Sequence, residues 1–85
     1  MTKPKVTVFT MPQCPKCPAA KELVKQVGES LDIDIEEVDI KEDMVKGLQF
    51  GVASTPSVAV NEKLISRGEV PDREELIAQI KRAIG

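Results

Sequence analysis

The chain has 85 residues, which is enough for one small hydrophobic core and too few for two, so we expect a single domain spanning residues 1–85. Its 12 basic and 14 acidic residues give a net charge of −2, which argues against a nucleic-acid-binding protein because such a protein needs a concentrated basic surface. The sequence contains no histidine, and this excludes both Cys/His nucleophilic pairs and Cys2His2 zinc sites.

The apolar residues are spread along the chain in short runs. No run approaches the length of a membrane-spanning helix, and the start of the sequence lacks the apolar segment of a secretory signal. We therefore expect a cytoplasmic protein with no membrane contact. Cytoplasmic compartments keep thiols reduced, which bears on the role of the two cysteines.

The first half of the chain alternates between strand-like and helix-like patterns. Lys5–Thr10 is a short run rich in β-branched residues, which is typical of a buried strand. Apolar residues then recur three and four positions apart and predict a helix with one buried stripe, formed by Ala20, Leu23, Val24 and Val27. Gly28, near the end of this stripe, is the expected stop signal. Residues 33–40 alternate only in part, so we expect a second strand shorter than the whole run.

The second half predicts a short helix, a hairpin and a longer helix. Asp43–Phe50 has a helical pattern. A tight turn at Asn61–Glu62 separates two strand-like apolar pairs, which are Val58 with Val60 and Leu64 with Ile65. The last helix, within residues 71–84, has Asp72 as its N-cap and a predicted buried stripe of Leu76, Ile77, Ile80 and Ile84.

The predicted order of elements is β-α-β-α-β-β-α. The initial strand-helix-strand unit implies a parallel pair with a right-handed crossover, and the tight turn adds an antiparallel strand. We therefore expect an α/β domain with a four-stranded mixed sheet flanked by three helices.

Both cysteines lie in the stretch CPKC, residues 14–17, where the first strand gives way to the first helix. A disulfide placed for stability would join distant segments, because closing so short a loop contributes only about 2 kcal/mol in the chain-entropy model. A metal site would need a second chain or an exogenous thiol, because two thiolates fill half of a tetrahedral shell. A redox pair needs two thiols close enough to bond and one reactive enough to attack. The motif favours this third interpretation and leaves the other two open.

The position of the pair gives its two thiols different roles. The dipole and free N–H groups of a helix N-terminus stabilise a thiolate placed before the first turn, where we expect Cys14. Pro15 suits the first helical position because no N–H is needed there, and Lys16 adds a positive charge beside the pair. We therefore expect the pKa of Cys14 to lie below the usual value of about 8.5, and Cys17 to be more buried and less acidic. A second proline, Pro18, either marks the true helix start or removes an early hydrogen bond.

This asymmetry predicts a dithiol exchange. Cys14 attacks a substrate disulfide, and Cys17 then attacks Cys14, which releases the reduced substrate and leaves the pair oxidised. The predicted catalytic residues are Cys14 and Cys17, with Pro15 and Lys16 as the active-site loop. We expect disulfide-containing proteins as substrates, an external reductant, no cofactor or bound metal, and a monomer.

The CPKC stretch at a strand-to-helix junction, followed by Thr55–Pro56 just before the strand SVAV, resembles the thioredoxin and glutaredoxin superfamily. The resemblance covers nearly all of the chain. VTVFTMPQCPKCPAAKELV looks like the first strand, active-site loop and helix, and FGVASTPSVAVNEKLISRG looks like a helix end, a cis-proline loop and the terminal hairpin. The chain is similar to the small, glutaredoxin-sized thioredoxins of the archaeal type.

The resemblance implies a thioredoxin-like fold and thiol–disulfide oxidoreductase activity, with Cys14 as the nucleophile and Cys17 as the resolving thiol. It also implies a cis peptide bond at Thr55–Pro56, packed against the pair. The Thr55 backbone would offer an extended edge to which a substrate polypeptide adds as a strand. Gly68 would keep the surface beside the cysteines open for close approach.

Several positions depart from the family patterns. Thioredoxins usually have Trp before the first cysteine, where this chain has Gln13, and a buried Asp six residues before that cysteine, where it has Val8. The acid that assists proton transfer from the resolving thiol is therefore replaced by an apolar residue. Glutaredoxins have Tyr in the loop and paired glycines for glutathione, whereas this chain has Lys16 and a single glycine in SRGEVPDRE. We therefore expect a thioredoxin reductase, in preference to glutathione, to recycle the pair.

A metal-binding module is the alternative from a different functional class. Small copper chaperones also carry CxxC at a strand-to-helix junction with a methionine nearby, and some glutaredoxins bridge iron–sulfur clusters or zinc between two chains. Met11, however, lies three residues before the first cysteine instead of two, and the predicted last element is a helix where copper chaperones have a strand. These differences favour the oxidoreductase.

Overall fold

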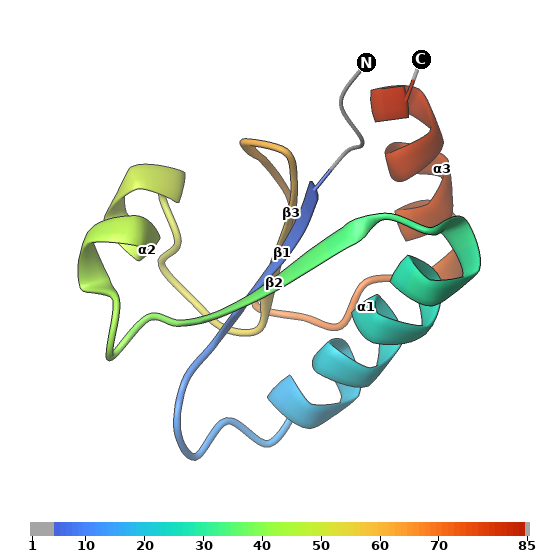
Figure 1. Cartoon of the computed structure of the whole chain (residues 1–85). Helices are drawn as coiled ribbons and strands as arrows, with labels where there is room; N and C mark the ends of the chain where they lie inside the picture. Colours follow the sequence, from blue (N-terminus) through green and yellow to red (C-terminus); the bar gives the residue numbers. More distant parts are fainter. Residues whose placement is uncertain (1–4, 85) are drawn as a thin grey trace.

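The chain forms a mixed β-sheet with helices on both faces (Figure 1). The structure is a computed structural model that describes residues 5–84. Within this range the elements are, in order, β1 (Lys5–Thr10), α1 (Cys17–Leu31), β2 (Asp34–Asp39), α2 (Met44–Phe50), β3 (Ser57–Val60), β4 (Lys63–Arg67) and α3 (Arg73–Ile84). Both the predicted order and the predicted fold class are confirmed.

The strand order β2-β1-β3-β4 places β1 inside the sheet. β1 runs parallel to β2 and antiparallel to β3, and β3 forms an antiparallel hairpin with β4. The crossover from β1 to β2 passes through α1, which lies with α3 on one face of the sheet, while α2 covers the other face (Figure 1). The carboxyl end of β1 leads directly into the segment that carries the cysteines.

Side chains of β1 alternate between two apolar clusters. Val6 and Val8 are fully buried on the α1 and α3 face, together with the predicted helical stripes, which contribute Ala20, Val24, Val27, Leu76 and Ile80. Phe9 is fully buried on the α2 face and contacts Phe50, with ring centroids 5.1 Å apart. The side chain of Ile84, predicted to join the last stripe, lies outside the described residues. The two aromatic residues of the chain therefore meet in the core beneath α2.

The hairpin turn falls where it was predicted. Asn61 adopts the left-handed conformation with φ 56°. Its side-chain Oδ1 accepts a hydrogen bond from the Lys5 N–H at 3.0 Å, and its own N–H donates to the Lys5 carbonyl at 2.7 Å. The asparagine therefore both forms the β3–β4 turn and ties it to the start of β1.

The first helix continues past Gly28 to Leu31, so the predicted stop at Gly28 is wrong. Asp32 instead takes the left-handed conformation, with φ 54°, and its N–H donates to the Gly28 carbonyl. Gly28 is buried beneath β2, and a Cβ at this position would lie within 2.5 Å of both Cγ1 and Cδ1 of Ile35. The glycine permits a close contact between helix and strand and does not end the helix.

A substitution tests this contact. Gly28→Ala should lower the free energy of unfolding by up to about 2 kcal/mol, because overpacking costs about 1–3 kcal/mol and alanine regains only about 1 kcal/mol of helix propensity. In an Ile35→Ala background the same change should raise stability by about 1 kcal/mol, since the next atom that the new Cβ would meet is the Ile33 carbonyl oxygen at 3.7 Å. Urea unfolding measures both values. The same sign of change in the two backgrounds would contradict the steric explanation.

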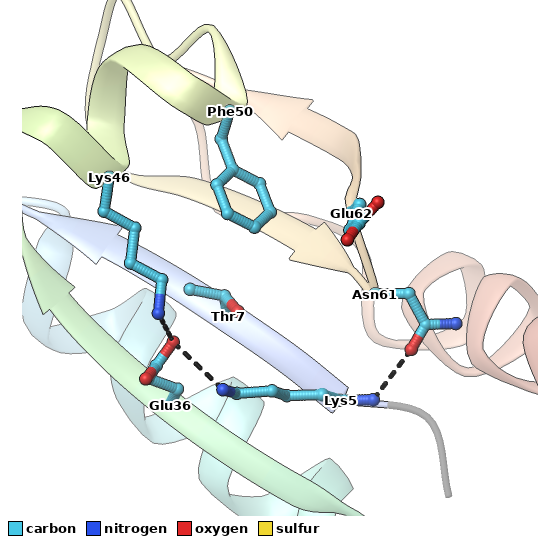
Figure 2. A pocket seen from close by; sticks show the side chains of 7 residues that line it. All are labelled: Lys5, Thr7, Glu36, Lys46, Phe50, Asn61 and Glu62. Atoms are coloured by element: carbon cyan, nitrogen blue, oxygen red, sulfur yellow. Dashed lines mark hydrogen bonds and ion pairs between the residues drawn. The ribbon is translucent and has the colours of Figure 1, made fainter. Parts of the chain in front are cut away.

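Glu36 of β2 links three elements on the α2 face (Figure 2). Its carboxylate accepts a hydrogen bond from the Lys46 ammonium of α2 and lies 3.3 Å from the Lys5 Nζ of β1. These side chains, with Thr7 and the Phe50 ring, line an open cavity of about 400 Å³. The hydrogen bond from Lys46 is the main cause of a lowered pKa of Glu36; Lys5 adds to it, and partial burial opposes it.

The lowered pKa of Glu36 predicts that its contribution to stability depends on pH. A carboxyl group whose pKa is lower in the folded state stabilises the fold above its unfolded pKa, and the contribution disappears as the pH falls from about 4.5 through the folded pKa. Glu36→Gln should therefore lower the free energy of unfolding by less than about 1 kcal/mol at pH 7, because the pair is open to water. The difference should vanish in strong acid. Urea unfolding at both pH values, with Glu29→Gln as a charge-matched control, measures it; a difference that persists in acid would show that lost packing is the cause.

Candidate active site

The two cysteines lie in the connection between β1 and α1. They form a disulfide, with their Cα atoms 5.3 Å apart. Gln13, the residue before the pair, adopts the left-handed conformation with φ 64°. Cys17 is only 4% exposed, whereas Cys14 is half-buried, so Cys17 is the more buried of the two, as predicted.

The first helix begins two residues later than predicted. Lys16 is its N-cap, so the first helical positions belong to Cys17 and Pro18 and not to Pro15. A helix that started at Pro15 would need the Pro18 nitrogen to donate to the Cys14 carbonyl, and proline has no N–H. That carbonyl instead accepts from the Cys17 N–H at 3.3 Å. Pro18 therefore excludes a helix start at Pro15.

The later start changes the surroundings of the nucleophile candidate. The Cys17 N–H, which would be a free donor if Cys14 capped the helix, donates to the Cys14 carbonyl. The pair still lies at the N-terminal end of a 15-residue helix, whose dipole favours negative charge there. One of the backbone donors expected for a Cys14 thiolate is therefore engaged in the oxidised structure.

An open cavity of about 310 Å³ surrounds the pair. Both cysteines line it, together with the loop before them and with Thr10, Pro18, Lys21 and Asp39. Thr10 and Asp39 are partners in the parallel pairing of β1 with β2, and Lys21 lies one helical turn after Cys17. The site therefore contains one basic and one acidic side chain from two different elements.

Sequence reasoning missed these two charged residues. Neither Lys21 nor Asp39 was among the predicted site residues. The four-residue step from Cys17 to Lys21 is a signal that could have found the lysine. Asp39 could be found only from the pairing register of β1 with β2. Pro15 and Lys16, the predicted loop residues, are exposed and lie outside the cavity lining.

The remaining predicted residues reach the same edge of the sheet from β3 and β4. Ser57 is paired with Phe9 and with Arg67, so Pro56 and Gly68 come next at the edge where β1 leads into the cysteine loop. The Thr55–Pro56 peptide bond is cis. Pro56 is buried and Thr55 is half-buried. Neither of these residues, nor Gly68, belongs to the cavity lining around the sulfurs.

Gly68 is constrained by its own backbone and by a neighbour. Its φ of 73° lies in the left-handed region, and a Cβ there would lie 2.9 Å from the Ser54 Oγ. The residue after β4 therefore packs against the segment that leads to the cis bond. A side chain at this position would be strained by the positive φ and would require the Ser54 hydroxyl to move.

A family model for the thioredoxin domain matches residues 4–81. The chain belongs to the thioredoxin family. It is 31% identical to the thioredoxin of Methanocaldococcus jannaschii, covering 99% of this chain and 100% of that protein, and 39% identical to a probable thioredoxin of Methanothermobacter marburgensis, covering 94% and 95%. Among solved structures, thioredoxin 1 of Thermosipho africanus superposes with a TM-score of 0.75 at 28% identity, covering 94% of this chain and 93% of that one.

Family and site together identify this thioredoxin-family protein as a thiol–disulfide oxidoreductase, which acts on disulfides and needs a reductant. The position that holds a buried acid in larger thioredoxins is Val8, which is fully buried in the aliphatic cluster on the α1 and α3 face. Among the described residues there is no group of three or more His, Cys, Asp or Glu side chains that could hold a metal ion. The described helices also include none that is long and apolar enough to cross a membrane.

Proposed function

We propose that this thioredoxin-family protein reduces disulfides in other proteins by dithiol exchange, with Cys14 as the nucleophile and Cys17 as the resolving thiol. The unequal burial of two bonded cysteines at the start of a helix carries the proposal. An incoming disulfide can approach the half-buried Cys14 sulfur, whereas Cys17 is shielded. The two thiols supply the nucleophile and the resolving group.

The exchange has two balanced steps. The Cys14 thiolate attacks one sulfur of the substrate disulfide, so that a Cys14–substrate bond forms, the substrate S–S bond breaks, and the departing thiolate takes a proton from solvent. Cys17 then gives its proton to solvent and attacks the Cys14 sulfur, so that the Cys14–Cys17 bond forms, the Cys14–substrate bond breaks, and the departing substrate thiolate takes a proton from solvent. The substrate gains two electrons and two protons. An external reductant must return them to the pair.

The segment before β3 is the proposed docking edge for the substrate. In this proposal the Thr55 backbone pairs with an extended substrate chain beside Pro56, and main-chain hydrogen bonds supply affinity without demanding one sequence. Gly68 lies next to Ser54 and has no side chain that could block an approaching substrate chain. The proposed docking edge therefore tolerates many partners.

We further propose recycling by a thioredoxin reductase in preference to glutathione. Lys16 stands where glutaredoxins have a tyrosine, and Gly68 is the single glycine of its segment, so two features that glutaredoxins use for glutathione are replaced. The proposed setting is a monomer in the cytoplasm, where thiols are kept reduced. Lys16 and Pro15 lie between the cysteines, at the surface that a reductase would meet.

The proposal is tested with protein that is purified anaerobically and reduced. It should accelerate reduction of the insulin disulfides well beyond dithiothreitol alone, and a flavin-dependent thioredoxin reductase should sustain turnover better than glutathione does. Metal analysis of the same preparation tests the alternative. A stoichiometric metal that survives gel filtration, with no acceleration of insulin reduction, would favour a metal-binding module and overturn the proposal.

A further inference from the structure

A thiolate at the cysteine pair needs positive charge close to the sulfur atoms. Sequence reasoning assigned that charge to Lys16 and to free N–H groups of the helix. The structure gives the Cys17 N–H to the Cys14 carbonyl and leaves Lys16 exposed and outside the cavity that holds both sulfurs. The helix N-terminus still favours negative charge at the pair, and a further cationic side chain at the cavity would add to that effect.

Lys21 is the cationic side chain that lines the cavity with both cysteines. It lies four residues after Cys17 on α1, and side chains at this spacing are neighbours on one face of a helix. Its ammonium is 3.8 Å from the Glu37 carboxylate of β2. Because the two side chains are 43% and 54% exposed, this ion pair is weak, and it holds the lysine near β2 without neutralising its charge.

Asp39 is the anionic side chain in the same lining. It ends β2 opposite Thr10, and its Oδ1 accepts a hydrogen bond from the Lys41 N–H at 2.9 Å. The Asp39 carbonyl also accepts from the Asp43 N–H at 2.8 Å, so the turn after β2 holds this residue in place. A fixed carboxylate at this point repels a thiolate in the cavity.

We propose that Lys21 is the cation that stabilises the thiolate of the cysteine pair and that Asp39 opposes it, so that these two residues set how readily exchange begins. The inference deepens the proposed function and rests on it. Both residues act on the thiolate through their electric charge, and neither forms a bond to the substrate. The site thus carries its charges at the cavity surface, whereas Val8 fills the buried position on β1.

Screening by solvent sets the expected size of the pKa shift. Unit charges within one cavity interact through partly wet protein, which corresponds to about half a pKa unit or more. The effect should shrink as salt is raised, because the side chains are reached by solvent. A purely structural role of Lys21 would show neither the pKa change nor the salt dependence.

The experiment measures the pH dependence of thiolate absorbance in the reduced protein and in single variants. Lys21→Met should raise the pKa of the more acidic thiol by about half a unit, which makes the thiolate fraction below that pKa roughly threefold smaller. Lys21→Arg should restore the wild-type pKa. Asp39→Asn, which keeps an oxygen for the Lys41 N–H, should shift the pKa the opposite way. Lys25→Met, one further turn along α1, is the charge-matched control and should produce no resolved shift, because it lies about 12 Å along the helix from Cys17.

Two outcomes overturn the inference. In the first, Lys16→Met shifts the thiol pKa as much as Lys21→Met does. In the second, the thiol pKa of the Lys21→Met protein equals that of the wild type, although its urea unfolding is unchanged. These outcomes are separable from failure of the proposed function. Absence of insulin reduction with the predicted pKa shifts would remove the function and leave the electrostatic assignment intact. Normal insulin reduction with unchanged thiol pKa values would leave the function intact and remove the electrostatic assignment.

Discussion

Replacement of Cys14 by serine should abolish disulfide reduction, with a loss of turnover of at least about a thousandfold. A serine hydroxyl cannot attack a disulfide near neutral pH, and Cys17 cannot substitute because it is 4% exposed at the start of α1. The measurement is insulin reduction under a coupled reductase assay. A second variant, Pro15→Ala, keeps both thiols and should retain measurable turnover.

The opposite result would reassign the chemistry. Undiminished turnover by the Cys14→Ser protein would mean that Cys17 is the nucleophile and that its burial in the oxidised structure does not persist after reduction. Loss of turnover in both the Cys14→Ser and the Pro15→Ala proteins, with normal unfolding curves, would show that the loop conformation matters beyond the thiols.

The largest expected effect on stability is at Phe9. Phe9→Ala should lower the free energy of unfolding by about 3–5 kcal/mol, because the ring is fully buried and its removal leaves a cavity beneath α2. It also removes the contact with Phe50, whose ring centroid is 5.1 Å away. For so small a domain this is a large part of the total stability. Urea unfolding monitored by circular dichroism gives the value.

Leu48→Ala is the matched control for this prediction. Leu48 lies on α2, as Phe50 does, but its side chain is 77% exposed, so truncation should change stability by no more than about 0.5 kcal/mol. Equal losses for the two variants would contradict the assignment of the α2-face core to the aromatic pair. A loss at Phe9 below about 1 kcal/mol would contradict it as well.

The elements of this fold could be predicted because their local patterns agree with their tertiary roles. Five of the six residues of the run Lys5–Thr10 are buried, all but Lys5, and Asn61 has the turn conformation that its residue type favours. Gly28 was misread because a glycine can serve either a left-handed helix end or a close contact. Only the position of Ile35 in the folded chain decides between the two.

Some residues of the active site could also be predicted from local sequence, and others could not. Cys14 and Cys17 could be predicted from their spacing and their place between strand and helix. The start of α1 was predicted two residues too early, although Pro18 lacks the N–H that a start at Pro15 would require. Lys21 and Asp39 join the site through helix periodicity and strand register, and the uneven alternation of residues 33–40 hid the register of Asp39.

The most direct test is to trap the exchange half-way. Reduced protein with Cys17→Ser is mixed with a disulfide-bonded protein, quenched in acid, digested and mapped by mass spectrometry. A covalent adduct through the residue-14 sulfur should accumulate to near stoichiometry, because no thiol remains to resolve it. An unmodified sulfur at residue 14 after prolonged incubation, in a folded protein, would contradict this prediction.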